Sequence, residues 1–325
     1  MKTTTLGRSG LHVSRIAFGT WQLGGEWGGF DEDAAITAIR HARELGVNFF
    51  DTAQAYGFGA SERLLATALR DDLTRNRDQV VIATKGGLRP TDSGVVRDAS
   101  PQWLRQGVDA SLTALGIDHI DLYQVHWPDP KVPAADTAGA LRELVAEGKI
   151  GHVGVSNYHA QQMAEFAATL PVETVQPPYH LFRREIEDEV LPYSREHDIG
   201  VLVYGPLAHG LLTGTMTEKT TFARDDWRSN SAVFTGATYR HNLAVVRALE
   251  SFAAEGGMTV SQLAIAWTLA NPAVHVAIVG ARQPNHVQDS LAAADISLSN
   301  DDLAAIDKIM ASATPVDGPT PEGVR

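Results

Sequence analysis

The sequence predicts an α/β fold, a (β/α)8 TIM barrel with an N-terminal β-hairpin and an extra C-terminal helix, on the strength of three observations. Short runs of β-branched and aromatic residues alternate with longer segments whose apolar residues recur every three or four positions, as in parallel strands joined by helices. Eight such strand–helix units follow one another. Residues 20–200 contain no linker-like stretch of Gly, Ser and Pro, which disfavours the alternative, a doubly wound sheet with a second domain. We therefore expect residues 1–325 to form one domain.

Each predicted strand is a short apolar run bounded by turn or polar residues. The strands are Arg15–Gly19, Val47–Asp51, Val80–Thr84, Ile120–Val125, Ile150–Val155, Thr174–Gln176, Gly200–Tyr204 and Val276–Val279. The helices between them have ordinary start and stop signals, as where Ser100 can cap a helix that has Pro101 in its first turn and Gly116 at its end. The helices are Asp31–Leu45, Ser61–Leu73, Ser100–Leu115, Pro133–Glu147, Ala160–Leu170, Glu185–His197, Val260–Ala270 and Pro284–Ala293.

Three further segments lie outside this repeat. Thr3–Leu6 and Leu11–Ser14 flank a glycine-containing turn and predict a hairpin that plugs the bottom of the barrel. His209–Asn242 is too long for a plain connection and is predicted to be a binding loop. An amphipathic helix, Asp301–Ala311, precedes a tail, Thr314–Arg325, which we expect to fray or to fold over the site.

Composition and charge exclude several classes of function. Hydrophobic residues make up 44% of the chain and charged residues 20%, a composition that supports a buried core and rules out disorder of the whole chain. The net charge of −12, without any run of Lys and Arg, makes nucleic acid and anionic membrane poor partners. The absence of cysteine removes thiol chemistry, so a redox reaction would need a cofactor. Neither a signal peptide nor a membrane span is expected, and we predict a cytoplasmic location.

Polar residues stand at the carboxyl ends of the predicted strands. They are Asp51, Lys85, His126, Ser156, Asn157, Gln176 and Tyr204. Each alone could have a structural role, but the carboxyl ends of barrel strands meet at one mouth, where the active sites of such barrels lie. A buried lysine next to a buried aspartate is costly unless the two are paired. The sequence therefore predicts a catalytic cup that contains an ion pair between Asp51 and Lys85.

Tyr56 follows Asp51 by five positions and adds an acid–base group to this cup. A tyrosine has a pKa of about 10, too high for efficient proton transfer at neutral pH. A neighbouring ammonium group favours the phenolate and lowers that pKa. We expect Lys85 to supply this charge, Asp51 to hold Lys85 protonated, and His126 to orient a carbonyl oxygen toward the Tyr56 hydroxyl.

These four residues and their surrounding segments resemble the aldo-keto reductase superfamily, from near the first strand to about residue 311. The segments are VNFFDTAQAYGFGASERLLATAL, VVIATKGG, LYQVHWPDP, GKIGHVGVSN and IVGARQP. LYQVHWPDP and YGPLAHGLLTG are most similar to bacterial members of the branch that includes potassium-channel β-subunits. The resemblance implies a (β/α)8 barrel that reduces aldehydes or ketones to alcohols with NADPH, with Tyr56 as general acid and Asp51, Lys85 and His126 as the other catalytic residues.

The resemblance also implies which residues bind the cofactor and the substrate. The cofactor residues are Thr20, Trp21, Ser156, Asn157, Gln176, Tyr204, Gly205, Pro206, Leu207, Gly280, Arg282, Gln288 and Ser290. The side chains of Ser156, Asn157 and Gln176 would hold the nicotinamide carboxamide, and Tyr204 would stack on the ring. The implied substrate wall consists of Trp21 and Trp127, with Trp27 and Phe30 as further candidates.

Arg282 leads us to expect NADPH in preference to NADH, with NADH accepted more weakly. It follows the last strand and precedes a helix that is predicted to begin near Pro284, where backbone amides already favour an anion. A guanidinium group matches the oxygens of a ribose 2′-phosphate. Two residues depart from the family pattern, since relatives often carry Arg or Lys at His209 and Asn at Ser290. We therefore expect the distal half of the cofactor to be bound more weakly than in those relatives.

Two other functions remain open at this point. Lys85 at a strand end could form a Schiff base with a carbonyl substrate, as in barrel aldolases. The barrel could instead be an interaction module that senses the redox state of nicotinamide, although His126 favours an enzyme. The histidine and carboxylate spacing contains no metal-binding motif, and no metal is expected. The sequence names neither the physiological substrate, which we expect to be a small carbonyl compound, nor the oligomeric state.

Overall fold

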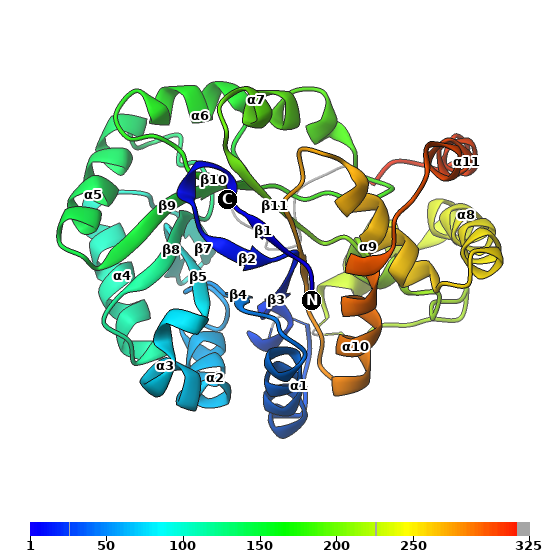
Figure 1. Cartoon of the computed structure of the whole chain (residues 1–325), viewed down its shortest axis with the longest axis horizontal. Helices are drawn as coiled ribbons and strands as arrows, with labels where there is room; N and C mark the ends of the chain where they lie inside the picture. Colours follow the sequence, from blue (N-terminus) through cyan, green and yellow to red (C-terminus); the bar gives the residue numbers. More distant parts are fainter. Residues whose placement is uncertain (26, 225, 317–325) are drawn as a thin grey trace.

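Eight parallel strands form a closed barrel in the computed structural model, which describes residues 1–25, 27–224 and 226–316 (Figure 1). The strands are β3 (Ile16–Gly19), β4 (Phe49–Asp51), β5 (Val81–Gly86), β8 (Ile120–Val125), β9 (Ile150–Ser156), β10 (Thr174–Gln176), β11 (Gly200–Tyr204) and β12 (Val276–Val279). They follow one another around the barrel in chain order, and β12 closes it by pairing with β3, where Ala277 lies opposite Ile16. The predicted fold class is confirmed.

Helices surround the barrel as an outer ring (Figure 1). They are α1 (Glu32–Glu44), α2 (Ala60–Ala68), α3 (Arg70–Arg75), α4 (Pro101–Leu115), α5 (Ala134–Ala146), α6 (Ala160–Ala167), α7 (Val190–Glu196), α9 (Val260–Ala270) and α10 (Pro284–Ala292). The start of α4 has the predicted signals, because the Ser100 hydroxyl accepts a hydrogen bond from the Trp103 amide and Gly116 ends the helix in the left-handed conformation.

Two of the predicted helices are interrupted. The helix expected over Ser61–Leu73 is divided into α2 and α3 at Leu69, which is buried in the same apolar cluster as residues on either side of it. The helix expected over Glu185–His197 consists of a 3-10 turn, Glu185–Glu187, followed by α7. Pro192 explains the second break, because a proline lacks the amide hydrogen and is tolerated only in the first turn of a helix.

A β-hairpin and a long helix were not predicted. A hairpin of β6 (Leu88–Thr91) and β7 (Gly94–Arg97) follows β5, and the long helix α8 (Gly236–Glu255) begins inside the segment that was expected to be a loop up to Asn242. The rest of that segment contains short 3-10 turns joined by irregular chain. The predicted binding loop is therefore too long at its C-terminal end.

The N-terminal hairpin of β1 (Thr3–Thr5) and β2 (His12–Ser14) closes the bottom of the barrel, as predicted. Leu6 and Val13 are fully buried and belong to the same cluster as apolar residues of the barrel interior. Gly7 has φ 50° and packs so closely on the start of β11 that a side chain would collide with the backbone of Gly200. The open end of the barrel is therefore the end where the strands finish.

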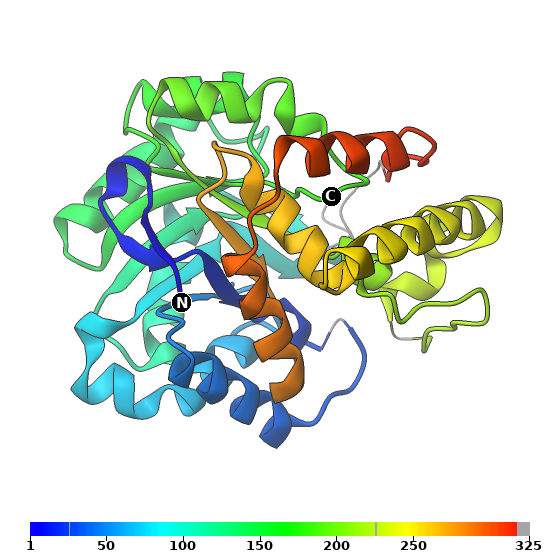
Figure 2. The same cartoon turned by 45° about the vertical axis from the view of Figure 1, so that its right-hand side comes forward.

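The C-terminal part of the chain packs on the outside of the ring. Helix α11 (Asn300–Met310) lies beside α8 (Figure 2). Asn242 and Thr314 exchange two hydrogen bonds of 3.0 Å, and the Val316 amide donates to the Phe182 carbonyl. The remainder of the predicted tail, 317–325, lies outside the described residues. Among the residues that are described, no helix has the length and apolar character to cross a bilayer.

Candidate active site

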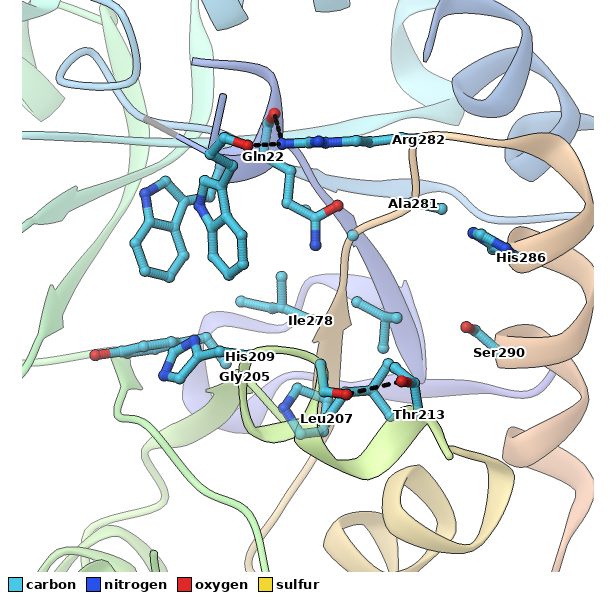
Figure 3. Close-up of a pocket in the computed structure, with 18 of the residues that line it drawn as sticks. Gln22, Gly205, Leu207, His209, Thr213, Ile278, Ala281, Arg282, His286 and Ser290 are labelled. Atoms are coloured by element: carbon cyan, nitrogen blue, oxygen red, sulfur yellow. Dashed lines mark hydrogen bonds between the residues drawn. The ribbon is translucent and has the colours of Figure 1, made fainter. Parts of the chain in front are cut away.

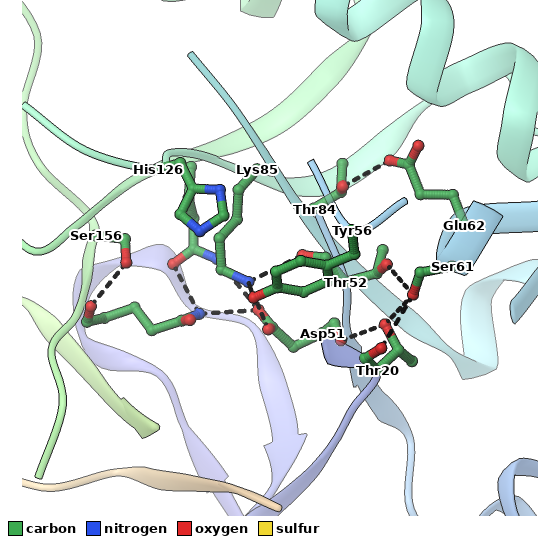
Figure 4. Close-up of polar contacts among 12 residues, drawn as sticks. Thr20, Asp51, Thr52, Tyr56, Ser61, Glu62, Thr84, Lys85, His126 and Ser156 are labelled. Carbon is green, nitrogen blue, oxygen red and sulfur yellow. Dashed lines mark hydrogen bonds and ion pairs between the residues drawn. The ribbon is translucent and has the colours of Figure 1, made fainter. Parts of the chain in front are cut away.

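Four predicted catalytic residues meet at the open end of the barrel (Figure 4). Lys85 Nζ donates hydrogen bonds to Asp51 Oδ1 at 2.6 Å, to the Thr52 carbonyl at 2.9 Å and to the Tyr56 hydroxyl at 3.3 Å. The ring of His126 packs edge-on against that of Tyr56, with the ring centroids 5.8 Å apart. Lys85 is 1% exposed and Asp51 3%, so the ion pair is shielded from water. The structure brings the four residues together as the sequence predicted.

The second carboxylate oxygen of Asp51 is also held by donors. Asp51 Oδ2 accepts hydrogen bonds from Gln176 Nε2 at 2.8 Å and from Gln124 Nε2 at 3.4 Å. With the bond from Lys85 to Oδ1, the Asp51 carboxylate accepts hydrogen bonds from three side chains. Gln176, which we expected to contact the cofactor carboxamide, uses its amide nitrogen to hold Asp51. Gln124 was absent from the predicted site.

The loop between β4 and α2 carries Tyr56 in a tightly constrained conformation. Gly57, Phe58 and Gly59 follow it with φ values of 60°, 43° and 92°, three consecutive residues in the left-handed region. The Ser61 hydroxyl donates to Thr20 Oγ1 at 2.6 Å (Figure 4), and the Ser61 amide donates to the Tyr56 carbonyl at 3.2 Å. These contacts fix the end of the loop against Thr20, which directly follows β3.

A second group of polar side chains lines the wall at the ends of β9, β10 and β11. The Tyr204 hydroxyl donates to Asn157 Oδ1 at 2.9 Å, and Asn157 Nδ2 donates to the His126 carbonyl at 3.0 Å. The Ser156 hydroxyl donates to the Gln176 carbonyl at 2.9 Å. Asn157 has φ 62°, a left-handed conformation that Asn adopts more readily than most residues. These bonds hold the side chains in place before any ligand binds.

A cavity of about 610 Å³ extends from the catalytic residues to α10. Figure 3 shows Gln22 and Arg282 on one side of it and Gly205, Leu207 and His209 on the other. The predicted cofactor and substrate residues that line it are Trp21, Trp27, Ser156, Asn157, Gln176, Tyr204, Gly205, Pro206, Leu207, Gly280, Arg282 and Ser290. Its size and its mixture of apolar and polar walls are typical of a site for a cofactor together with a small substrate.

Aromatic side chains cover the catalytic end of the cavity. The indole of Trp21 lies nearly parallel to the Tyr56 ring at 6.3 Å and edge-on to the Trp27 indole at 5.0 Å. His209 packs on both tryptophans, with centroid distances of 5.9 and 6.1 Å, and has φ 56°. An apolar wall of this kind favours an apolar or aromatic group next to the catalytic residues.

The distal end of the cavity combines groups of both signs. Arg282 Nη2 donates to the Trp27 carbonyl at 2.8 Å and to the Gln22 carbonyl at 3.4 Å (Figure 3), and burial lowers the pKa of its guanidinium group. Asp289 and His286 also line this end, although the sequence did not point to them. In this conformation Arg282 therefore fastens the loop after β3.

Five of the predicted site residues are not among those that line the cavity. Lys85 is buried against Asp51 and Tyr56, which do line it. Thr20 is buried behind it and donates its hydroxyl to the Asp51 carbonyl at 3.2 Å. The Trp127 ring lies beneath the guanidinium group of Arg97, with 4.8 Å between the ring centroid and the guanidinium carbon. The centroid of the Phe30 ring lies 6.0 Å from the guanidinium carbon of Arg282. Gln288 is exposed on the outer side of α10.

Comparison with known proteins identifies the family. The family model described as "Aldo/keto reductase family" matches residues 15–311. The chain is 41% identical to aldo-keto reductase YhdN of Bacillus subtilis, over 95% of this chain and 94% of that protein, and 34% identical to the NADH-specific methylglyoxal reductase of Escherichia coli, over 96% and 99%. A solved glycerol dehydrogenase from Gluconobacter oxydans is 39% identical and superposes with a TM-score of 0.86 over 95% of both chains. With its barrel, its four clustered polar residues and these similarities, the chain belongs to the aldo/keto reductase family of oxidoreductases.

Proposed function

We propose that the protein reduces aldehydes or ketones to alcohols with NADPH, and that Tyr56 protonates the product oxygen. One observation carries the proposal: the Tyr56 hydroxyl lies 3.3 Å from the ammonium group of Lys85 at the wall of a large cavity, and Asp51 holds Lys85 by an ion pair of 2.6 Å. Such an arrangement suits proton transfer from a phenol, because the neighbouring positive charge stabilises the phenolate that remains.

The shape and lining of the cavity fit a nicotinamide cofactor. Asn157 and Ser156 present polar atoms near the catalytic residues, Tyr204 offers a flat ring, and the glycine-containing turn from Gly205 leads toward α10. At the far end the N-terminal half of α10 offers backbone amides and a helix dipole to an anion. We infer that these residues would hold the nicotinamide, the pyrophosphate and the adenosine end, respectively. When bound, the cofactor supplies a hydride to the carbonyl carbon.

The residues of the chain supply the proton and the orientation. Tyr56 donates its hydroxyl proton to the carbonyl oxygen as that oxygen becomes an alcohol, and the phenolate is stabilised by Lys85. His126, whose ring packs against Tyr56, stands where it can direct the carbonyl oxygen toward the hydroxyl. Solvent then returns the proton to Tyr56, so that each turnover consumes one hydride and one proton.

The preference between NADPH and NADH depends on Arg282. Its position at the distal end supports recognition of a 2′-phosphate, and a hydrogen bond to a charged group contributes about 1.5–3 kcal/mol. Asp289 in the same lining and the two carbonyl partners of Arg282 oppose a strong preference. We propose a preference for NADPH of about tenfold. The test compares kcat/KM for both coenzymes in the wild type and in Arg282→Ala. If the substitution lowers kcat/KM equally for NADPH and NADH, Arg282 does not recognise the 2′-phosphate and the proposed preference is wrong.

The aromatic wall of Trp21, Trp27 and His209 supports small aromatic or apolar carbonyl substrates. The test follows nicotinamide absorbance with a panel of aromatic aldehydes, aliphatic aldehydes, ketones and sugars. We expect the highest kcat/KM for an electron-poor aromatic aldehyde. If no carbonyl compound in the panel accelerates coenzyme oxidation, the proposed function is wrong.

The contacts of Lys85 disfavour the alternative of a Schiff-base lyase. Its ammonium group is almost fully buried and donates to three oxygen atoms, whereas imine formation requires a neutral amine that can reach the substrate. Borohydride treatment in the presence of substrate should therefore leave the mass of the protein unchanged. A trapped adduct on Lys85 would favour the lyase.

A further inference from the structure

A carboxyl group is buried directly behind the catalytic lysine. Glu62, in the first turn of α2, is 1% exposed, and its Oε1 accepts a hydrogen bond of 2.7 Å from the Thr84 hydroxyl (Figure 4). Thr84 precedes Lys85 in β5, and successive side chains of a strand point to opposite faces. Thr84 and Glu62 therefore lie on the helix side of β5, while Lys85 lies on the barrel side.

Stability alone does not explain why a carboxyl group is buried at position 62. Burial raises the pKa of Glu62, while the hydroxyl groups of Thr84 and Ser111 favour its charged form. Nearby, Gln54 Oε1 and the Tyr123 hydroxyl have no hydrogen-bond partner among the described residues. These two atoms lie near each other, since both are 3.0 Å from the point that a side-chain carbon on Gly107 would occupy. Burying a carboxyl group destabilises a fold unless the group is fully hydrogen-bonded. An apolar residue at position 62 would avoid this cost. We therefore look for a function of the carboxyl group other than stabilising the fold.

We propose that Glu62 is a positioning residue that keeps Tyr56 within reach of Lys85. The loop that carries Tyr56 ends where α2 begins, and its three left-handed residues follow Tyr56 directly. The bond between Glu62 and Thr84 ties the start of α2 to the strand residue next to Lys85. Together with the bonds from the Gln54 amide to the Lys85 carbonyl and from Lys85 Nζ to the Thr52 carbonyl, this bond links the two segments whose separation sets the 3.3 Å contact between Tyr56 and Lys85.

This inference rests on the proposed function, and two variants test it without coenzyme. Glu62→Ala and Thr84→Val each remove the bond, while Glu62→Gln keeps an oxygen that can accept from Thr84. The ionisation of Tyr56 is followed by ultraviolet difference titration, after subtraction of the same protein carrying Tyr56→Phe. We expect Glu62→Ala and Thr84→Val to move the ionisation midpoint of Tyr56 to higher pH, toward the ordinary value of about 10, because Tyr56 moves away from the Lys85 charge.

Catalysis provides the second readout. Under saturating coenzyme, kcat should fall about tenfold in Glu62→Ala and Thr84→Val with little change in KM, since a displaced general acid affects the chemical step. Glu62→Gln should recover most of the activity. Glu173→Gln is a matched control, because Glu173 also accepts a hydrogen bond from a strand, at the Val153 amide, but next to the start of β10. It should leave kcat unchanged.

The outcomes separate positioning from a role in stability alone. If Glu62→Ala and Thr84→Val lower the melting temperature but leave both the Tyr56 midpoint and the kcat of the folded protein unchanged, the proposal is overturned. Thr84→Val keeps the shape of the side chain and decides the question even if Glu62→Ala does not fold. A wild-type protein that turns over no carbonyl substrate would refute the proposed function, whereas the titration would still test the positioning role.

Discussion

Replacing Lys85 by Met should destabilise the protein strongly and in a pH-dependent way. Met has about the length of the lysine stem but no charge, so the substitution removes the ammonium group from a pair that is almost fully buried. Asp51 Oδ1 and the Thr52 carbonyl lose their donor, while Asp51 Oδ2 keeps Gln176 and Gln124. The variant is left with an unpaired carboxylate in the interior.

The size of the destabilisation follows from the loss of the charge that pairs with Asp51. Removing one partner of a buried ion pair costs about 3–5 kcal/mol. The cost can be reduced if Asp51 takes up a proton, so its pKa in the folded variant should rise above the unfolded value of about 3.9. A group whose folded pKa is raised binds its proton more tightly in the folded state. The loss of unfolding free energy relative to the wild type should therefore be small near pH 4. It should grow by about 1.4 kcal/mol per pH unit until the pH exceeds the pKa of Asp51 in the folded variant.

Urea unfolding at about pH 5 and pH 8, followed by tryptophan fluorescence, measures this difference against the wild type. Lys149→Met is the matched control, because Lys149 also donates to an aspartate, Asp109 at 2.8 Å, but at the surface. The control should unfold at the same urea concentration as the wild type. A Lys85→Met protein within about 1 kcal/mol of the wild type at pH 8, or a deficit equal at both pH values, would refute the reasoning.

Three further predictions concern other parts of the fold and site. Asn157→Ala should raise the coenzyme Kd about tenfold, measured by quenching of tryptophan fluorescence, because its side chain holds the cavity wall; an unchanged Kd would remove it from the site. Gly86→Ala should lower the urea midpoint, since its methyl group would overlap the Tyr123 hydroxyl, and Tyr123→Phe should restore part of the loss. Glu173→Gln should cost more stability near pH 6 than near pH 9, because the hydrogen bond to Glu173 raises the pKa of His152 and this contribution is lost as pH rises through the raised value; equal costs would contradict it.

The barrel and the catalytic cup could be predicted because both depend on a local pattern. Strands such as Phe49–Asp51 are short apolar runs that end on a polar residue, and chain order alone places their ends at one mouth. Tyr56 was predicted from its position five residues after Asp51 in the sequence and from the effect that the charge of Lys85 has on a phenol. The structure brings these three residues into contact.

Elements whose borders depend on tertiary packing were missed. Helix α8 begins at Gly236 within a stretch of Thr, Gly and Ser that locally favours a loop, and its burial against α9 and α11 comes from distant parts of the chain. The hairpin of β6 and β7 contains Pro90, which is compatible with an edge strand but weakens any strand prediction.

The side chains that were missed in the site follow rules that sequence reasoning could have applied. Gln124 has the same strand parity as His126, so both face the barrel interior. His286 and Asp289, which were missed, share one face of α10 with the predicted Ser290 by the spacing of three and four residues, whereas the predicted Gln288 lies off that face. Glu62 could not be predicted, because its pocket is formed by residues from separate elements.

The central claim, that Tyr56 is the general acid of a carbonyl reductase, is tested most directly by single-turnover oxidation of bound NADPH in Tyr56→Phe. The substitution removes one hydroxyl and keeps the ring that packs on Trp21 and His126. We predict an unchanged Kd for NADPH and a rate of coenzyme oxidation by an aromatic aldehyde that falls by a factor of about 100 or more. A near wild-type rate at an unchanged Kd would contradict the mechanism.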